Sequence, residues 1–423
     1  MNFNTNPNSR IAYYFDEEIG IYTFKKGHPM RPFRIKMTDE LIKSYQLTDN
    51  MQCYDSTFFD FDDRIFYQFH SEEYIDLLKN ITEENIGIYQ EQFMRFGFSA
   101  DCPNPTNSKF YDLCKLYTTG SVLGAALINS KQVDCAVNWS GGLHHAKRQE
   151  ASGFCYVNDC VLAILELLKT HQRVLYIDID VHHGDGVEEA FFTTNRVMTC
   201  SFHKFKDFFP GTGNYTDIGY GKGQNHAVNF PLNEGINDDV YRTIFRPVMD
   251  SIIECFKPGA IVLQCGTDSL SGDKLGCFNL SVKGHGDCVE YIKSKNIPYI
   301  LLGGGGYTLR NIARCWTYET AVAVGKDISN EIPEHKYSDY FYPENKIHTY
   351  VSNMQNLNTD DELHFITNKL IENVRSIDFY SEEARVEHKN PTDSRALLIE
   401  EKKSLNRENQ EELSEKYRTD VNI

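Results

Sequence analysis

Residues 174–186 read Val-Leu-Tyr-Ile-Asp-Ile-Asp-Val-His-His-Gly-Asp-Gly. The apolar run at its start does not alternate with polar residues, which indicates a strand buried on both faces, as in parallel sheets. Carboxylates and imidazoles follow at once, and two glycines let the backbone turn away. Because open α/β sheets bind ligands at the carboxyl ends of their strands, this stretch predicts both the fold class and the place of a site.

Similar apolar runs recur along the chain and alternate with longer helical patterns. The expected strands are Ile11–Phe15, Val133–Asn138, Val174–Ile179, Val197–Ser201, Ala260–Gln264 and Tyr299–Leu302. The expected helices are Phe110–Asn129, Asn158–Lys169, Asn237–Phe256, Val282–Ser294 and Thr308–Val324. This alternation predicts an α/β protein with a central parallel sheet flanked by helices.

The composition shows no break before about residue 390 and no internal repeat. We therefore expect one large domain over residues 1–390. Residues 391–423 are rich in Glu, Lys, Arg, Asn and Ser and contain few large apolar side chains. That composition predicts a charged, disordered tail.

The chain has 423 residues, of which 41% are hydrophobic, enough to bury a core and to exclude wholesale disorder. Its 60 acidic residues against 43 Lys and Arg give a net charge of −17. This charge repels phosphate backbones, so we expect no direct nucleic-acid binding. It would attract basic partners such as lysine-rich protein tails, but on charge alone plain solubility is the preferred interpretation.

No run reaches the roughly 18 apolar residues that a membrane helix needs. Residues Met1 to Arg10 lack the apolar core of a signal peptide, so we expect no membrane insertion and a location inside the cell. The 12 cysteines are then expected to be reduced thiols. No Cys-x-x-Cys pair occurs, which argues against a cysteine zinc knuckle.

Two strand ends carry candidate metal ligands. Asp178, Asp180 and His182 follow one strand, and side-chain alternation would place all three on one side. Asp268 follows the strand Ala260–Gln264. Asp180, His182 and Asp268 together predict a three-ligand catalytic site with open positions, and oxygen and nitrogen donors suit Zn²⁺, Fe²⁺ or Mn²⁺.

Two further strand ends supply polar groups that suit hydrolysis. His144 and His145 follow Trp139-Ser140-Gly141-Gly142, and imidazoles near a metal site can accept and return a proton. Tyr307 follows four glycines, Gly303 to Gly306, and its hydroxyl could steady a developing oxyanion. No Lys-Ser/Thr follows the glycines, so a nucleotide P-loop is disfavoured. The set predicts metal-assisted amide hydrolysis.

These residues and their surroundings resemble the class I histone deacetylases, the zinc-dependent lysine deacetylases of the arginase-deacetylase fold. The resemblance spans roughly residues 10–385 and includes the long stretches Asn138–Asp159, Arg173–Ala190, Leu263–Leu280 and Leu302–Ala321. Residues 151–159 and 275–279 are similar to the nuclear, corepressor-associated members. The resemblance implies hydrolysis of N6-acetyl-lysine in histone tails, transcriptional repression and chromatin regulation.

The resemblance also implies roles for individual residues. Asp180, His182 and Asp268 would bind Zn²⁺, and Tyr307 would donate to the transition state. His144 and His145 would handle protons, with His145 as the general base, and Asp178 and Asp185 would orient them. The implied substrate contacts are Asp101, Gly153, Phe154, Phe209 and Leu275. The implied K⁺ site comprises Asp178, Asp180, His182, Ser201 and Phe202.

Members that bind corepressor proteins also bind an inositol phosphate, and the matching basic positions are Arg31, Lys274 and Arg310. Lys274 replaces a usual Arg and lacks its two-pronged geometry. Thr267 stands where an Ala is usual, beside Asp268, and the loop Pro103–Ser108 is about two residues longer than is typical. The resemblance implies a nuclear location and leaves the cytoplasm open.

Three alternatives stay open at this point. An arginase-like ureohydrolase would need an Asp-x-His-x-Asp pattern, but Asp185 follows His182 after two intervening residues. An acetylpolyamine hydrolase would share the chemistry and differ only in substrate. A non-catalytic scaffold of a repressor complex is disfavoured because every catalytic position is filled.

Overall fold

The fold described here is that of a computed structural model, which describes residues 9–82, 84–99, 102 and 110–377. The expected contact Asp101, the loop Pro103–Ser108 and the charged tail after residue 390 lie outside these residues, so the expected domain boundary stays a prediction. No helix in the described part of the chain is both long and apolar enough to cross a lipid bilayer.

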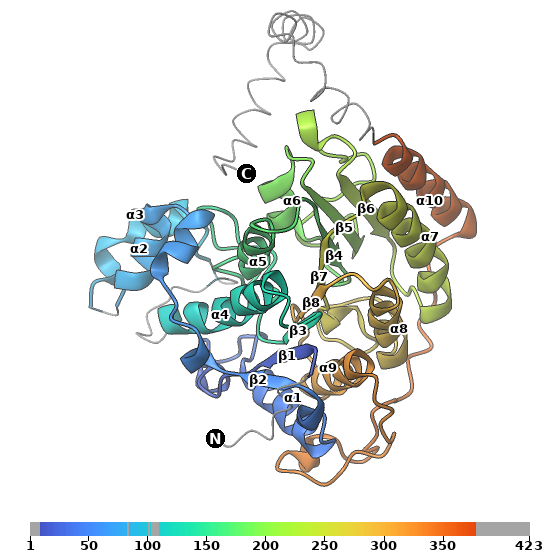
Figure 1. Cartoon of the computed structure of the whole chain (residues 1–423). Helices are drawn as coiled ribbons and strands as arrows, with labels where there is room; N and C mark the ends of the chain where they lie inside the picture. Colours follow the sequence, from blue (N-terminus) through green and yellow to red (C-terminus); the bar gives the residue numbers. More distant parts are fainter. Residues whose placement is uncertain (1–8, 83, 100–101, 103–109, 378–423) are drawn as a thin grey trace, which may run out of the picture.

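The described residues form an eight-stranded sheet in the order β2-β1-β3-β8-β7-β4-β5-β6, and all neighbouring strands are parallel (Figure 1). The strands are β1 Ile11–Tyr14, β2 Gln52–Tyr54, β3 Cys135–Asn138, β4 Val174–Asp178, β5 Val197–Lys204, β6 Ala227–Leu232, β7 Ala260–Gln264 and β8 Tyr299–Leu302. The expected parallel α/β architecture is confirmed.

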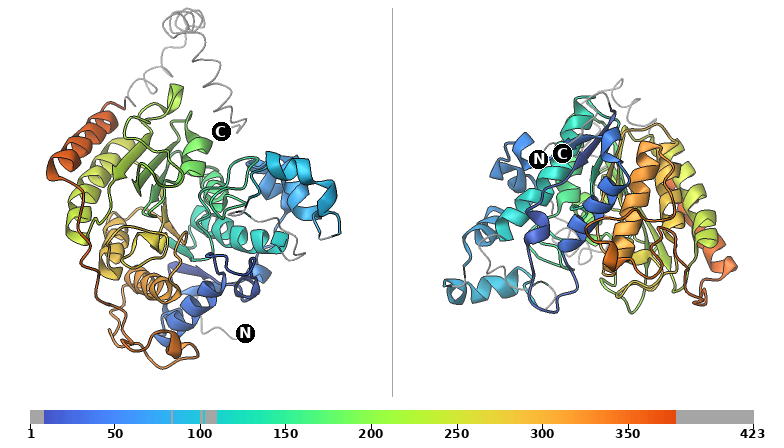
Figure 2. Two further views of the ribbon diagram at one scale, coloured as in Figure 1. Left: turned by 180° about the vertical axis from the view of Figure 1, so that it is seen from behind. Right: turned by 90° about the horizontal axis from the view of Figure 1, so that it is seen from below.

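Helices cover both faces of this sheet. They are α1 Phe33–Ser44, α2 Glu72–Asn80, α3 Gln90–Arg95, α4 Phe110–Asn129, α5 Asp159–Leu167, α6 Asp185–Phe191, α7 Asp238–Phe256, α8 Val282–Lys293, α9 Leu309–Val324 and α10 Asp360–Arg375. Helix α4 packs on α5, whereas α1, α9, α8, α7 and α10 form a row in which each contacts the next. Figure 2 shows the α4–α5 pair and the α9–α8–α7–α10 row on opposite sides of the sheet.

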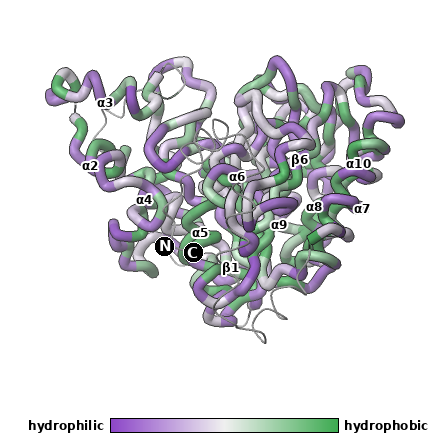
Figure 3. Tube along the Cα trace, turned by 90° about the horizontal axis from the view of Figure 1, so that it is seen from above, coloured by the Kyte–Doolittle hydropathy of each residue, from purple (hydrophilic) through white to green (hydrophobic). Residues whose placement is uncertain are grey.

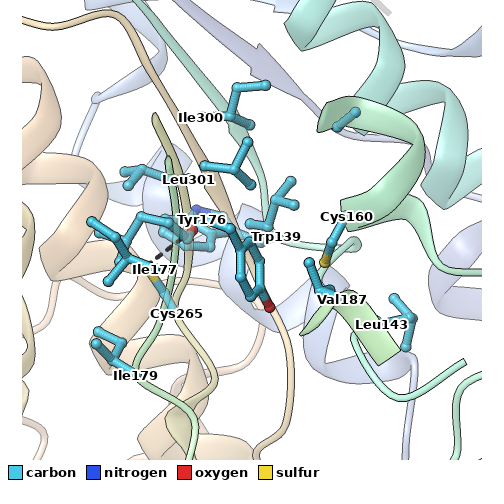
Figure 4. Packing of buried hydrophobic residues seen from close by; sticks show 14 of the residues in the cluster. Trp139, Leu143, Cys160, Tyr176, Ile177, Ile179, Val187, Cys265, Ile300 and Leu301 are labelled. Atoms are coloured by element: carbon cyan, nitrogen blue, oxygen red, sulfur yellow. Dashed lines mark hydrogen bonds between the residues drawn. The ribbon is translucent and has the colours of Figure 1, made fainter. Parts of the chain in front are cut away.

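The core lies between these layers. Residues of β4 and β7 are buried throughout, as their unbroken apolar sequences require. Figure 3 shows α2 and α3 projecting to one side of the molecule and hydrophobic segments alternating with hydrophilic ones along the helices. Figure 4 shows Tyr176 of β4 packed near Trp139, Cys160 and Val187.

Helix boundaries follow the capping side chains. The expected helices that begin at Asn158 and Asn237 begin one residue later, because each Asn is the N-cap and its side chain accepts from the backbone N–H three residues on. Two strands were missed, β2 and β6. Both are edge strands; β2 has three residues, and β6 contains Pro231, which only an edge strand accommodates readily.

The strand register decides where the site forms. Asn138 of β3 pairs with Leu302 of β8, Leu302 with Gln264 of β7, and Gln264 with Asp178 of β4. These four neighbouring strands therefore end in one row, and the segments after them leave the sheet side by side.

Candidate metal centre and active site

Three ligand side chains from two segments converge at this row of strand ends. The ligand atoms of Asp180, His182 and Asp268 all lie within 4.8 Å of one another, and all three residues are buried. His182 Nδ1 lies 3.0 Å from Asp180 Oδ1 and 3.1 Å from Asp268 Oδ2. The predicted ligand set is thus assembled.

The charge balance of this group fits a bound cation. Burial and the neighbouring Asp180 carboxylate raise the pKa of Asp268 to about 7. Burial lowers the pKa of His182, but Asp268 and Asp180 together outweigh it and raise this pKa to about 10. Two buried carboxylates therefore need a positive charge between them, and a divalent cation supplies it while leaving the imidazole neutral. The donor set is that of a metal centre.

Backbone groups fix the two carboxylates. The Val181 N–H donates to Asp268 Oδ1 at 2.9 Å, and the Gly305 N–H donates to Asp180 Oδ2 at 2.8 Å. A Cβ atom on Gly305 would lie 1.9 Å from Asp268 Oδ2, and one on Gly266 would lie 1.9 Å from Asp180 Oδ2. Only glycine lets these segments approach the ligands so closely.

Asp178 and Asp180 both face the His144 ring, and these contacts are consistent with the expected placement of the two carboxylates on one side. Strand β4 ends at Asp178, and bends follow it at residues 180–182. As the resemblance implies, the Asp178 carboxylate contacts His144 Nδ1 at 2.7 Å, and it also accepts from the Tyr176 hydroxyl at 2.6 Å.

The paired histidines lie beside the metal ligands, each held by its own carboxylate. Their ring centroids are 3.9 Å apart. His144 Nε2 lies 3.8 Å from Asp180 Oδ2. His145 Nδ1 lies 2.7 Å from Asp185 Oδ1, and Lys147 Nζ lies 2.6 Å from the other oxygen of Asp185.

The two imidazoles differ in basicity. Burial lowers the pKa of His144, but Asp178 and Asp180 overcome this and raise it to about 9. Burial and the nearby His144 lower the pKa of His145 to about 3, although Asp185 opposes the shift. At neutral pH the pair therefore combines one protonated ring with one neutral ring that is free to accept a proton.

Aromatic side chains surround the ligands. The Phe209 ring lies 4.9 Å from the His145 ring, and the Phe154 ring lies 5.7 Å from the Tyr307 ring. A Cβ on Gly153 would lie 2.4 Å from His145 Cδ2 and 2.8 Å from Phe209 Cε1. Phe209 and Leu275 are 44% and 40% exposed. The predicted substrate contacts thus run from the metal ligands to the surface, except Asp101, which lies outside the described residues.

Tyr307 is buried next to the ligands. Burial, and then Asp268 and Asp180, raise its pKa well above the usual value, so the phenol stays protonated at neutral pH. A neutral hydroxyl in this position is a hydrogen-bond donor for an oxyanion.

Two more residues contribute to this site. Phe208 stacks on the His182 ring, with centroids 5.0 Å apart. Arg34, on α1, is buried and donates to the carbonyls of Gly304 and Gly306 at 2.6 and 2.9 Å, so it anchors the glycine segment before Tyr307. Sequence reasoning missed Arg34, because it lies far along the chain from the four strand ends and no local pattern marks it. Thr267 adds a further bond, from Oγ1 to the Gly305 carbonyl at 3.3 Å.

The remaining predicted residues lie around this centre. Ser201 and Phe202 are buried on β5, where Ser201 pairs with Asp178. Arg31, Lys274 and Arg310 are exposed. Arg31 lines a surface cavity of about 440 Å³ together with two further cationic residues, Lys25 and Lys26.

The model of the histone deacetylase domain family matches residues 28–323. The chain is 55% identical over 368 residues to histone deacetylase 1 of Homo sapiens, an alignment that covers 87% of this chain and 76% of the relative. It is 53% identical over 377 residues to probable histone deacetylase 1-B of Xenopus laevis, covering 89% and 78%. It is also 52% identical over 368 residues to histone deacetylase 19 of Arabidopsis thaliana, covering 87% and 73%.

Proposed function

The chain belongs to the histone deacetylase family and is a lysine deacetylase, and from this premise we propose how its residues divide the reaction. N6-acetyl-lysine of a histone tail enters between Phe154 and Phe209, and hydrolysis releases lysine and acetate. The observation that carries this proposal is the buried group Asp180, His182 and Asp268, with a neutral imidazole and a phenol beside it.

The metal is Zn²⁺, held by Asp180, His182 and Asp268. Two carboxylates and an imidazole supply the oxygen and nitrogen donors that zinc accepts, and three protein ligands leave open the fourth position of a catalytic zinc site. When bound, zinc polarises a carbonyl and makes a water nucleophilic near neutral pH.

The paired histidines carry out the proton transfers. His145 Nδ1 donates to Asp185, which leaves Nε2 as the acceptor for the proton of the attacking water. The low pKa of His145 keeps it neutral until it takes that proton, and its cation then protonates the leaving lysine nitrogen. His144, held by Asp178, lies beside it.

Tyr307 donates its phenol proton in a hydrogen bond to the oxyanion that forms from the acetyl carbonyl. Gly153, Phe154 and Phe209 wall the tunnel for the aliphatic lysine stem. Leu275 and Asp101 contact the peptide at the rim.

Two further ligands belong to this proposal. K⁺ is held by Asp178, Asp180, His182, Ser201 and Phe202, close to the catalytic residues. Inositol phosphate binds Arg31, Lys274 and Arg310, and the adjoining Lys25 and Lys26 support an anion site there because they line the same cavity as Arg31.

The proposed setting is the nucleus, where the chain represses transcription as part of a corepressor complex. Its relatives are named histone deacetylases, and a net charge of −17 favours lysine-rich tails over nucleic acid.

Acetate release from an acetyl-lysine histone peptide tests the proposal, with N-acetylspermidine as the competing substrate. We expect faster turnover of the peptide and full inhibition by a zinc-chelating hydroxamate. Equal or faster turnover of the polyamine would overturn the substrate assignment. An unchanged rate in His145→Ala and Asp180→Ala variants that are folded would overturn the site assignment.

A further inference from the structure

One carboxylate outside the catalytic set joins two segments of the active site. Asp273 lies in the loop after β7, five residues beyond the ligand Asp268. Its Oδ2 accepts from the backbone N–H of Tyr307 at 2.7 Å and from that of Thr308 at 3.2 Å. Its Oδ1 accepts from the N–H of Leu275 at 2.9 Å and from that of Gly276 at 3.2 Å.

Asp273 lies at the N-terminus of helix α9, which has no capping group of its own. Tyr307 lies between the end of β8 and the start of α9, and the N-cap of α9, Thr308, makes no capping bond with its own side chain. The first turn of α9 carries no acidic residue. Asp273 therefore brings a negative charge to a helix N-terminus that has none of its own, where the helix dipole favours it.

Further hydrogen bonds hold the segment around Tyr307 in place. The Thr308 hydroxyl donates to the Gly272 carbonyl at 3.0 Å. On the other side, Arg34 holds the carbonyls of Gly304 and Gly306. The backbone around Tyr307 is thus held twice: Arg34 binds the carbonyls that precede Tyr307, and Asp273 binds the N–H of Tyr307 itself.

We propose that Asp273 is a positioning residue for the deacetylation reaction, which fixes the Tyr307 phenol over the metal site and ties it to the tunnel rim at Leu275. This inference rests on the proposed function, because it assigns Asp273 a role through Tyr307. Asp273 is not among the proposed metal ligands or substrate contacts.

A double-mutant cycle tests the proposal. The Asp273→Ala, Tyr307→Phe and double variants are compared with the wild type for kcat at saturating acetyl-lysine peptide, bound metal and Tm. We expect Asp273→Ala to keep its metal and to lower kcat at least ~10-fold, since small displacements of a reacting group cost this much or more. In the Tyr307→Phe background the same change should lower kcat less than ~2-fold, because the phenol is already absent.

A matched control is Asp238→Ala. Asp238 also accepts from a loop N–H, that of Ser281 at 2.8 Å, but it holds no catalytic segment. This variant should lower Tm and leave kcat within about two-fold of the wild type. If Asp273→Ala does not fold, Asp273→Asn replaces it, because its single amide oxygen keeps one of the two pairs of N–H bonds. We then expect a smaller loss of kcat that still shrinks in the Tyr307→Phe background.

Two results would overturn the inference. The first is a kcat in folded Asp273→Ala close to that of the wild type. The second is a decrease in kcat by the same factor in both backgrounds, which would indicate a general structural role. A Tyr307→Phe variant with wild-type kcat would instead refute the proposed function. The two failures are therefore distinguishable.

Discussion

His145 and Asp185 are joined by a contact of 2.7 Å between Nδ1 and Oδ1. Asp185 has a second partner, since Lys147 lies against its other oxygen. This pairing lowers the pKa of Asp185 well below its usual range despite its burial, and it fixes the orientation of the His145 ring. The structure thus presents His145 Nε2 as a neutral proton acceptor.

The first prediction concerns this acceptor. His145→Ala should lower kcat by about 10²- to 10⁴-fold, the usual contribution of a positioned general base. The measurement is acetate release at saturating peptide. His364→Ala, at an exposed position of α10, is the control and should keep the wild-type rate. Similar rates for the two variants would remove His145 from the mechanism.

The second prediction concerns the oxyanion donor. Tyr307→Phe should lower kcat by about 10²- to 10³-fold with a much smaller change in peptide KM, because its hydrogen bond forms mainly in the transition state. Steady-state kinetics separates the two constants. Tyr350→Phe, on the exposed surface, should change neither. A loss confined to KM would instead mean that Tyr307 serves only to bind substrate.

The third prediction concerns the glycine next to the ligands. A methyl group on Gly305 would collide with Asp268 Oδ2, so Gly305→Ala should displace this ligand and lose both metal and activity. The measurement is the metal content per chain by elemental analysis. Gly87→Ala is a matched control, because its added Cβ meets nothing within 4 Å. Full metal occupancy in Gly305→Ala would contradict the ligand geometry.

The fourth prediction concerns stability at low pH. His70 Nδ1 contacts the Arg148 carbonyl at 3.2 Å, and Nε2 accepts from the Asn158 N–H at 3.0 Å, so the ring is neutral. Burial lowers its pKa from 6.5 to about 3. The unfolded chain therefore binds the extra proton first, and the folded state loses stability as pH falls below 6.5. Between pH 7.5 and 5 the loss is about 2 kcal/mol.

Chemical denaturation at the two pH values checks this effect. In His70→Gln the free energy of unfolding should fall by about 2 kcal/mol less over the same interval, since no proton binds at this position. His364→Gln should behave as the wild type does. Equal pH dependence in wild type and His70→Gln would show that His70 is not held neutral by the fold.

Much of the fold could be predicted because its signals are local. The strand Ala260–Gln264 and the helix Phe110–Asn129 have the expected bounds, since long unbroken apolar and helical patterns determine them. Strand β6 was missed because Asn229 and Pro231 interrupt its pattern. The helix α10 was also missed: it lies far along the chain, beyond the strands that set the alternation.

Some residues of the candidate site could likewise be predicted from local sequence, and others could not. Asp180, His182 and Asp268 stand directly after buried strands, so their convergence could be predicted from the rule for strand ends. The contact between Asp178 and His144 was implied by the family resemblance rather than by this rule. Arg34 and Asp273 act through contacts with backbone groups of distant segments, and such contacts leave no pattern in the sequence around either residue.

Removal and return of the metal test the central claim most directly. The chain is stripped with a chelator, and acetate release and metal content are measured together before and after stepwise addition of Zn²⁺. We predict no activity without metal and recovery that reaches its plateau at one ion per chain in the wild type, with no recovery in Asp268→Ala. A metal-free chain that still releases acetate at the original rate would contradict the account.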